Sequence, residues 1–253
     1  MKTSGLITRR RALVTLASAS AGGVVLARFP RELPPTYGNL LRVGDTLTYA
    51  THRALLSNQA LVKEYTTRDI TSFPATGTTN PGTSDKLERA GDYRRLQATQ
   101  FSDWRLSVEG MVASPQSLSL DQIKRLSART QITRHTCEEG WTAIGQWTGV
   151  PLSLVLDAAG MLETARFVMF HSIDGWADSI DMLDALHPQT ILAYGMNGAD
   201  LPIPHGAPVR LRVERQMGYK SMKYVNRIVV FDEFEDGGEK GNIKNGWAWY
   251  TGI

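Results

Sequence analysis

Residues 134–141, Arg-His-Thr-Cys-Glu-Glu-Gly-Trp, contain Cys137, the only cysteine of this 253-residue chain. A single cysteine excludes an intrachain disulfide framework and any zinc or iron–sulfur site built from several thiolates. Three roles remain open for the thiol: a small buried side chain, a catalytic nucleophile with His135 or another histidine as base, or a metal ligand.

The neighbours of Cys137 discriminate among these roles. The flanking residues are polar and charged, which argues against a purely apolar environment. Glu138 and Glu139 argue against a nucleophile, because adjacent carboxylates raise the pKa of a thiol. A bound metal deprotonates a thiol whatever its neighbours are. The residues therefore favour a metal ligand whose fellow ligands come from a cofactor.

The positive charge of the chain is concentrated at its N-terminus. The formal net charge is +3, and residues 1–27 contain no acidic residue but four basic ones, Lys2, Arg9, Arg10 and Arg11. Without this segment the chain carries −1, so we expect no nucleic-acid partner. Thr8–Leu13, followed by the uncharged Ala12–Ala27, is similar to a twin-arginine signal peptide; the alternative is an uncleaved amphipathic helix. We therefore expect a periplasmic protein that is exported folded with a cofactor.

The rest of the chain divides at about residue 100. Residues 28–100 are poorly periodic and interrupted by prolines, and we expect them to wrap around a core formed by residues 101–253. Trp104–Glu109 alternates apolar and polar residues, which predicts a half-buried strand. Helices are predicted from the capping box at Ser119 to about Leu126 and over Val150–Gly160.

Five apolar runs, separated by turn signals, predict further strands: Phe167–Phe170, Ala177–Ile180, Ile191–Tyr194, Val209–Val213 and Ile228–Phe231. There is no βαβ alternation and no internal repeat. We therefore predict a single α+β domain with a mixed or antiparallel β-sheet.

Several blocks of the chain together resemble the sulfite-oxidase-type molybdopterin-binding oxidoreductase family. They are residues 135–141 with 147–152, 167–176, 192–198, 201–211 and 218–225. The resemblance spans roughly Trp104–Phe234 and implies the fold of that family with a mixed β-sheet. Cys137, Glu139 and Trp141 reproduce a C-x-E-x-W pattern typical of the periplasmic protein-methionine-sulfoxide reductase catalytic subunits.

The resemblance implies a molybdenum–molybdopterin cofactor and a set of residues that hold it. Cys137 matches the molybdenum ligand and the catalytic residue. The cofactor-binding positions are Ser172, His205, Arg210, Ser221, Met222 and Lys223, with Arg68 on an N-terminal loop as a further candidate. His205 stands where the reductase subfamily has Asn. The stretch Ser221–Lys223 corresponds to the part that holds the pterin phosphate.

Structural readings of the same residues stay open at this point. Arg210 on a strand-like run is also compatible with a solvated face, and Lys220 and Lys223 with surface charges. Trp141 and Trp147 suit either the core or the wall of a site.

The resemblance implies a molybdenum-dependent oxidoreductase that transfers an oxygen atom with two electrons, with S-oxides such as methionine sulfoxide as substrates. The alternatives are a sulfite-dehydrogenase-like activity and a cofactor-free periplasmic binding module. No haem-binding C-x-x-C-H motif is present, so we expect electrons from a separate protein, such as the membrane cytochrome b that relatives use. We expect a monomer.

Overall fold

The computed structural model describes residues 43–57 and 60–253, and the predicted signal peptide therefore lies outside the described residues. The chain divides into two compact units, Met1–Ser57 and Asn58–Ile253. The described part of the first unit contains helix α2, Val43–Leu55. Both sheets and the pocket described below belong to the second unit. Within the described ranges no helix combines the length and apolar character needed to cross a bilayer.

The first sheet of the second unit is mixed, as predicted from the sequence. Its strand order is β2-β1-β10-β5-β6. The bounds are β1 Arg105–Gly110, β2 Gln116–Ser119, β5 Phe167–Ser172, β6 Ala177–Asp181 and β10 Val225–Phe231. Strands β1 and β10 run parallel, and the other pairs are antiparallel.

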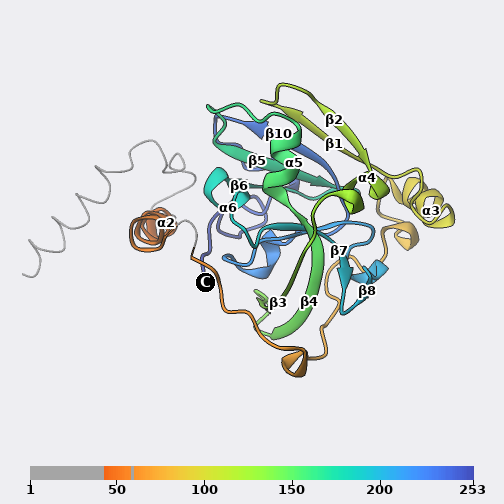
Figure 1. Cartoon of the computed structure of the whole chain (residues 1–253), viewed down its shortest axis with the longest axis horizontal. Helices are drawn as coiled ribbons and strands as arrows, with labels where there is room; N and C mark the ends of the chain where they lie inside the picture. The colour runs from red at the N-terminus through yellow and green to blue at the C-terminus, as the bar shows by residue number, and fades with distance from the viewer. Residues whose placement is uncertain (1–42, 58–59) are drawn as a thin grey trace, which may run out of the picture. The chain divides into compact units, whose positions relative to one another are not determined.

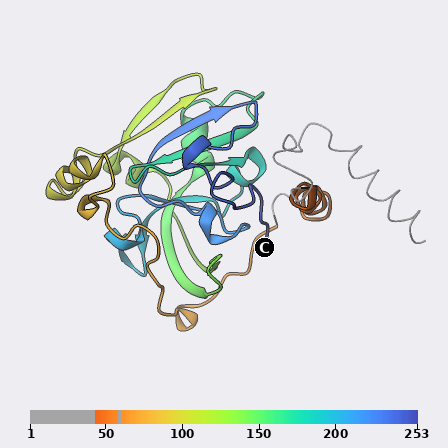
Figure 2. The same cartoon turned by 180° about the vertical axis from the view of Figure 1, so that it is seen from behind.

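The second sheet is antiparallel and lies beside the first in both views of the unit (Figures 1 and 2). It has the order β3-β4-β7-β8, with β9 also pairing with β7. The bounds are β3 Arg129–Thr136, β4 Thr142–Pro151, β7 Ile191–Met196, β8 Ala199–Asp200 and β9 Arg210–Arg212.

Short helices precede, connect and follow the strands. They are α3 Ala90–Ala98, α4 Leu120–Arg125, α5 Leu152–Ala158 and α6 Met182–Ala185, with 3-10 turns at η2 Thr67–Asp69, η3 Pro81–Thr83, η4 Ile203–His205, η5 Gly218–Lys220 and η6 Gly238–Lys240. Helix α4 begins with the predicted capping box: the Ser119 hydroxyl accepts from Gln122 N at 3.2 Å, and the Gln122 amide oxygen accepts from Ser119 N at 2.8 Å. Helix α5 starts later than predicted, because β4 continues to Pro151.

The main core is formed by apolar side chains of both sheets and of α5. Leu106 and Val108 alternate with less buried residues along β1 and have no exposed surface, as the alternation predicts. They pack in one cluster with Val155 of α5 and with Ile228 of β10. Each such side chain contributes about 1.5–3 kcal/mol through burial.

Several elements are absent from the sequence predictions: strands β2, β3, β4 and β8 and helices α2, α3 and α6. In β3 the buried residues are Gln131, Thr133 and His135, so the inward face is polar and shows no apolar alternation. In β4 two of the inward positions are Gly145 and Gly149. Strand β3 escaped prediction because its buried face is polar, and β4 because glycines interrupt an inward face that also contains the buried Trp147.

The N-terminal part of the second unit makes backbone hydrogen bonds with the second sheet. Tyr65 N donates to Ile132 O of β3 at 2.8 Å, and Thr71 N donates to Ile144 O of β4 at 3.0 Å. The chain then continues as a loop, residues 73–78, toward the pocket described next. The division into residues 28–100 and 101–253 itself stays a prediction.

Candidate cofactor site

Cys137 lies in the tight turn between β3 and β4. Its backbone N–H donates to Trp141 O at 2.9 Å, and Gly140 N donates to Cys137 O at 3.1 Å. Gly140 has φ +90°, a left-handed conformation that favours glycine. The turn therefore holds the cysteine in one position, and the Cys137 side chain is only 4% exposed.

The thiol of Cys137 is a poor nucleophile in this environment. Burial, together with the nearby Glu138 carboxylate, raises its pKa to about 11. The sulfur lies 3.5 Å from Glu138 Oε2 and 3.9 Å from Glu139 Oε2, close enough to donate its proton to a carboxylate. At neutral pH the free thiol is protonated, which argues against nucleophilic catalysis by an unliganded Cys137.

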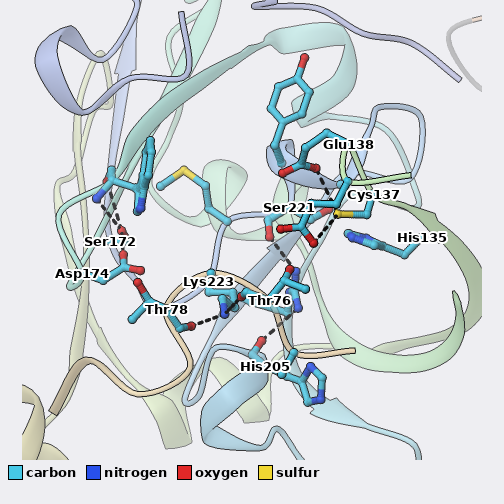
Figure 3. Close-up of a pocket in the computed structure, with 18 of the residues that line it drawn as sticks. Thr76, Thr78, His135, Cys137, Glu138, Ser172, Asp174, His205, Ser221 and Lys223 are labelled. Atoms are coloured by element: carbon cyan, nitrogen blue, oxygen red, sulfur yellow. Dashed lines mark hydrogen bonds between the residues drawn. The ribbon is translucent and has the colours of Figure 1, made fainter. Parts of the chain in front are cut away.

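Cys137 opens onto a pocket of about 300 Å³. Seven of the eight residues predicted for the site line it: Cys137, Ser172, His205, Arg210, Ser221, Met222 and Lys223. Figure 3 shows Cys137 with Glu138 and His135 on one side, and Lys223 with Thr76 and Thr78 on the other. Residues far apart in the sequence thus meet at one cavity.

Arg68 does not line this pocket. It lies in the 3-10 turn η2 and is exposed. The turn is closed by Asp69, whose carboxylate accepts from Thr66 N at 2.8 Å, and this leaves the Arg68 side chain in solvent. The segment reaches the pocket only five residues later, at Phe73.

Arg210 is buried, which excludes the solvated-face interpretation. Only 5% of the residue is exposed. Its guanidinium donates to His205 O at 3.0 Å and to Ser221 O at 2.8 Å, and it lies 5.0 Å from the centre of the Trp147 ring. Burial lowers the pKa of Arg210 to about 9, so the group is still charged at neutral pH.

The Nε atom of Arg210 shows whether the pocket residues fit a molybdopterin cofactor. It is buried and has no hydrogen-bond partner among the described residues. A buried charged donor without an acceptor is costly, and an acceptor-bearing anionic ligand in the adjoining pocket would satisfy it. Together with the Cys137 sulfur, this donor makes the site chemically suited to a pterin–dithiolene cofactor.

Ser172 and Ser221 each hold a turn as well as lining the pocket. The Ser172 hydroxyl donates to Asp174 and accepts from Trp176 N at 3.1 Å. Burial raises the pKa of Asp174, although hydrogen bonds from Ser172 and Thr78 oppose this shift. The Ser221 hydroxyl accepts from Val213 N at 3.2 Å, which leaves its own proton for a ligand.

His135 is fixed at the pocket by a buried ion pair. Arg212 donates to His135 Nδ1 at 2.7 Å and forms two hydrogen bonds with Glu214, at 2.9 and 2.8 Å. Burial and the positive charge of Arg212 lower the pKa of His135 to about 2, so the ring is neutral and carries its proton on Nε2. A Cβ atom on Gly218 would meet Nε2 at 2.3 Å, so this position requires glycine.

Phe73 is a pocket residue that the sequence analysis did not single out. Its ring centre lies 5.2 Å from that of His135, 5.7 Å from Trp141, 5.3 Å from Trp147 and 5.6 Å from His205. The sequence offers one signal for this residue: the family resemblance implies a cofactor contact from an N-terminal loop, with Arg68 as its candidate, and Phe73 lies five residues later. Trp141 lines the pocket, whereas Trp147 is fully buried in the core.

Residues after β10 form a further part of the pocket wall. Asn242 and Trp247 line the pocket. Asn242 donates to Asp178 Oδ2 at 2.5 Å, and the same carboxylate pairs with Lys220 Nζ at 2.8 Å. Lys220 is therefore a buried structural cation and not a surface charge.

Comparison with known proteins identifies the family. Residues 93–238 match the family described as the oxidoreductase molybdopterin binding domain. The chain belongs to this family. The match includes all pocket-lining residues that were predicted, and it excludes Arg68.

Two relatives with 35% sequence identity have names that refer to methionine sulfoxide reduction. A candidate protein-methionine-sulfoxide reductase subunit, YedZ1, from Azospira oryzae is 35% identical over 180 residues, which are 71% of this chain and 66% of that protein. The protein-methionine-sulfoxide reductase catalytic subunit MsrP of Xanthomonas campestris is 35% identical over 53% of this chain and 47% of its own. The chain thus spans between about half and two thirds of these relatives.

A solved structure supports the fold alone. The sulfane dehydrogenase SoxCD from Paracoccus pantotrophus superimposes with a TM-score of 0.52 at 24% sequence identity, covering 55% of this chain and 40% of that one. This likeness agrees with the predicted sulfite-oxidase-type α+β fold. Among residues 43–57 and 60–253, no group of three or more His, Cys, Asp or Glu side chains is placed to hold a metal.

Proposed function

We propose that this chain is a periplasmic molybdenum–molybdopterin oxidoreductase that reduces S-oxides, with methionine sulfoxide as the substrate to test first. The observation that carries the proposal is the joint placement of the Cys137 sulfur and the unpartnered Arg210 Nε at one pocket. The MsrP and YedZ1 relatives support the choice of substrate class.

In the proposed reaction an S-oxide takes up two electrons and two protons and gives the thioether and one water. The molybdenum centre, when bound, supplies the oxygen-atom transfer and the two-electron redox change. In this chain, Cys137 provides a sulfur ligand from a rigid turn, and Arg210 and Ser221 offer donors to the pterin. Met222 contributes an apolar side chain to the pocket wall, and Ser172 and His205 also line the pocket.

Metal analysis tests the cofactor assignment. The protein expressed in a host that makes molybdopterin is expected to contain about one molybdenum per chain. Cys137→Ser and Cys137→Ala are expected to lose most of it. Thermal unfolding is compared between cofactor-free preparations, since a bound cofactor itself stabilises the folded state, and there each variant is expected to unfold as a folded protein. Full activity in protein without molybdenum would overturn the proposal. Absence of both molybdenum and activity after expression in such a host would favour a cofactor-free binding module.

Substrate comparison separates reduction of S-oxides from oxidation of sulfite. Reoxidation of a reduced viologen dye is measured with methionine sulfoxide, dimethyl sulfoxide and an N-oxide, and reduction of ferricyanide is measured with sulfite. We expect turnover with the sulfoxides and at most a trace with sulfite. The reverse preference would support the sulfite-dehydrogenase-like alternative.

The export route and the electron donor belong to the same proposal. The Arg9–Arg11 run and the uncharged stretch behind it support twin-arginine export, and the lack of a haem-binding motif supports a separate donor such as a membrane cytochrome b. Replacing Arg9, Arg10 and Arg11 by Lys is expected to retain the protein in the cytoplasm with its molybdenum. Continued export of that variant would contradict the route.

A further inference from the structure

The ammonium group of Lys223 is occupied by the backbone of the N-terminal loop. Its Nζ donates to Thr76 O at 2.8 Å, to Thr78 O, and to Pro204 O at 3.1 Å (Figure 3). A lysine ammonium has three protons and therefore three donors. All three are used by carbonyl oxygens, and none is left for a phosphate.

Two neighbours fasten the same loop. The Tyr224 phenol oxygen lies 2.9 Å from Thr78 O and 2.9 Å from Ile203 O. The Thr78 side chain hydrogen-bonds the Asp174 carboxylate. Lys223, Tyr224 and Asp174 thus hold Thr78 through both its backbone and its side chain.

The fastened loop forms a wall of the pocket. Residues 73–78 all line the cavity, and Phe73 at the start of the loop packs against His135 and Trp141. Backbone hydrogen bonds pair the chain with β4 at Thr71, just before the loop. Between Thr71 and Thr78, the Lys223 ammonium is the only charged side chain that hydrogen-bonds the loop backbone within the described part of the chain.

We propose that Lys223 is a positioning residue that latches loop 73–78 over the pocket, and is not the phosphate ligand that the family resemblance implies. The proposal concerns the pocket to which the proposed function assigns the cofactor. It does not depend on the reaction catalysed there, because the contacts are made between parts of the chain itself.

Hydrogen exchange measured by mass spectrometry on the full chain tests the latch. It is run on protein from a host that cannot make molybdopterin and on cofactor-loaded protein. In both preparations Lys223→Met is expected to raise exchange at residues 73–79 by about tenfold or more, since it removes charged hydrogen bonds that oppose local opening. Tyr224→Phe is expected to raise it by about fivefold, and Lys223→Arg, which keeps a charged donor, to restore part of the protection.

Lys124→Met is the matched control, since this lysine pairs with Asp200 at 2.8 Å through an exposed carboxylate and makes no contact with the loop. Unchanged exchange at the β4 and β10 amides shows that each variant is folded. A phosphate ligand would change loop exchange only in the loaded protein, and that result would overturn the proposal. So would wild-type loop protection in Lys223→Met without cofactor. The cofactor-free comparison decides the latch even if no molybdenum is found, so failure of the proposed function and failure of the latch are distinguishable.

Discussion

At the scale of single residues, the most constrained side chains are the buried charges behind the pocket. Arg212 and Glu214 have almost no exposed side-chain surface, at 1% and 0%, and form a two-pronged ion pair. Gln131 donates to the same carboxylate at 3.0 Å, and Arg212 also stacks on Trp147 at 4.4 Å from its ring centre. The pair is fully satisfied, and through Arg212 it sets the orientation of His135.

Glu214→Gln is predicted to destabilise the protein strongly. The change keeps the shape of the side chain but leaves the Arg212 charge buried without its counter-ion, which costs about 3–5 kcal/mol. Urea unfolding of the purified protein measures this loss. Glu239→Gln is the control, because Glu239 forms an exposed pair with Lys244 and is expected to leave the midpoint unchanged. A loss of less than about 1 kcal/mol in Glu214→Gln would contradict the prediction.

At the scale of elements, predictions succeeded where local chemistry alone determines the structure. The capping box at Ser119 and the alternation in Trp104–Glu109 depend on neighbours a few residues away, and the structure has α4 and β1 at these places. The apolar runs after residue 167 correspond to β5, β6, β7, β9 and β10. Strands β3 and β4 could not be predicted by the same rules. Their inward residues Gln131, His135 and Trp147 contact the buried Arg212–Glu214 pair, which is distant in the sequence. Gly149 lies against the backbone of β7, where a side chain would not fit.

Ser119→Ala is predicted to lower the free energy of unfolding by about 1 kcal/mol. The serine side chain accepts from Gln122 N, and this first turn of α4 has no substitute acceptor in the described part of the chain. Thermal and urea unfolding measure the change. Ser117→Ala, an exposed serine two residues earlier on β2, is the matched control and is expected to be neutral. Equal stability of the two variants would show that the cap contributes nothing.

At the scale of the whole molecule, buried histidines couple stability to pH. Burial is the largest cause of a lowered pKa at His171, His187 and His205. His187 is a clear case: its Nδ1 accepts from Gln189 N at 3.2 Å and its Nε2 donates to Ala60 O at 3.0 Å, so the neutral ring satisfies both partners. A second proton on Nδ1 would face an N–H donor.

The free energy of unfolding is therefore predicted to fall as the pH drops below about 6.5. The unfolded chain protonates these histidines near their ordinary pKa, while the folded chain binds the protons only at lower pH, so acid favours unfolding. Each histidine contributes a slope of at most about 1.4 kcal/mol per pH unit. Urea unfolding at pH 7.5, 6.5 and 5.5 measures the dependence. His187→Gln is expected to flatten it, and an unchanged slope would exclude His187 as a contributor.

Most of the site could be predicted because its residues occur in family blocks of defined spacing. Seven predicted residues meet at one pocket, although they come from positions between 137 and 223. The N-terminal wall could not be located to the residue. Its contact is made by Phe73 and by backbone carbonyls of Thr76 and Thr78, and a backbone carbonyl leaves no mark on the sequence. Arg68 was predicted as the contact because an arginine side chain can bind an anionic group, whereas the loop makes its contacts with Lys223 through its main chain.

The pocket is lined by residues from Phe73 to Trp247, and this span has a consequence for the order of events in the cell. No shorter stretch of the chain contains all the walls, so the cavity does not exist while the ribosome is still synthesising the later strands. A cofactor could therefore bind in the complete pocket only after the chain has been synthesised as far as Trp247. Under the proposed export of the folded protein, a cofactor would have to bind after this point and before the protein leaves the cytoplasm.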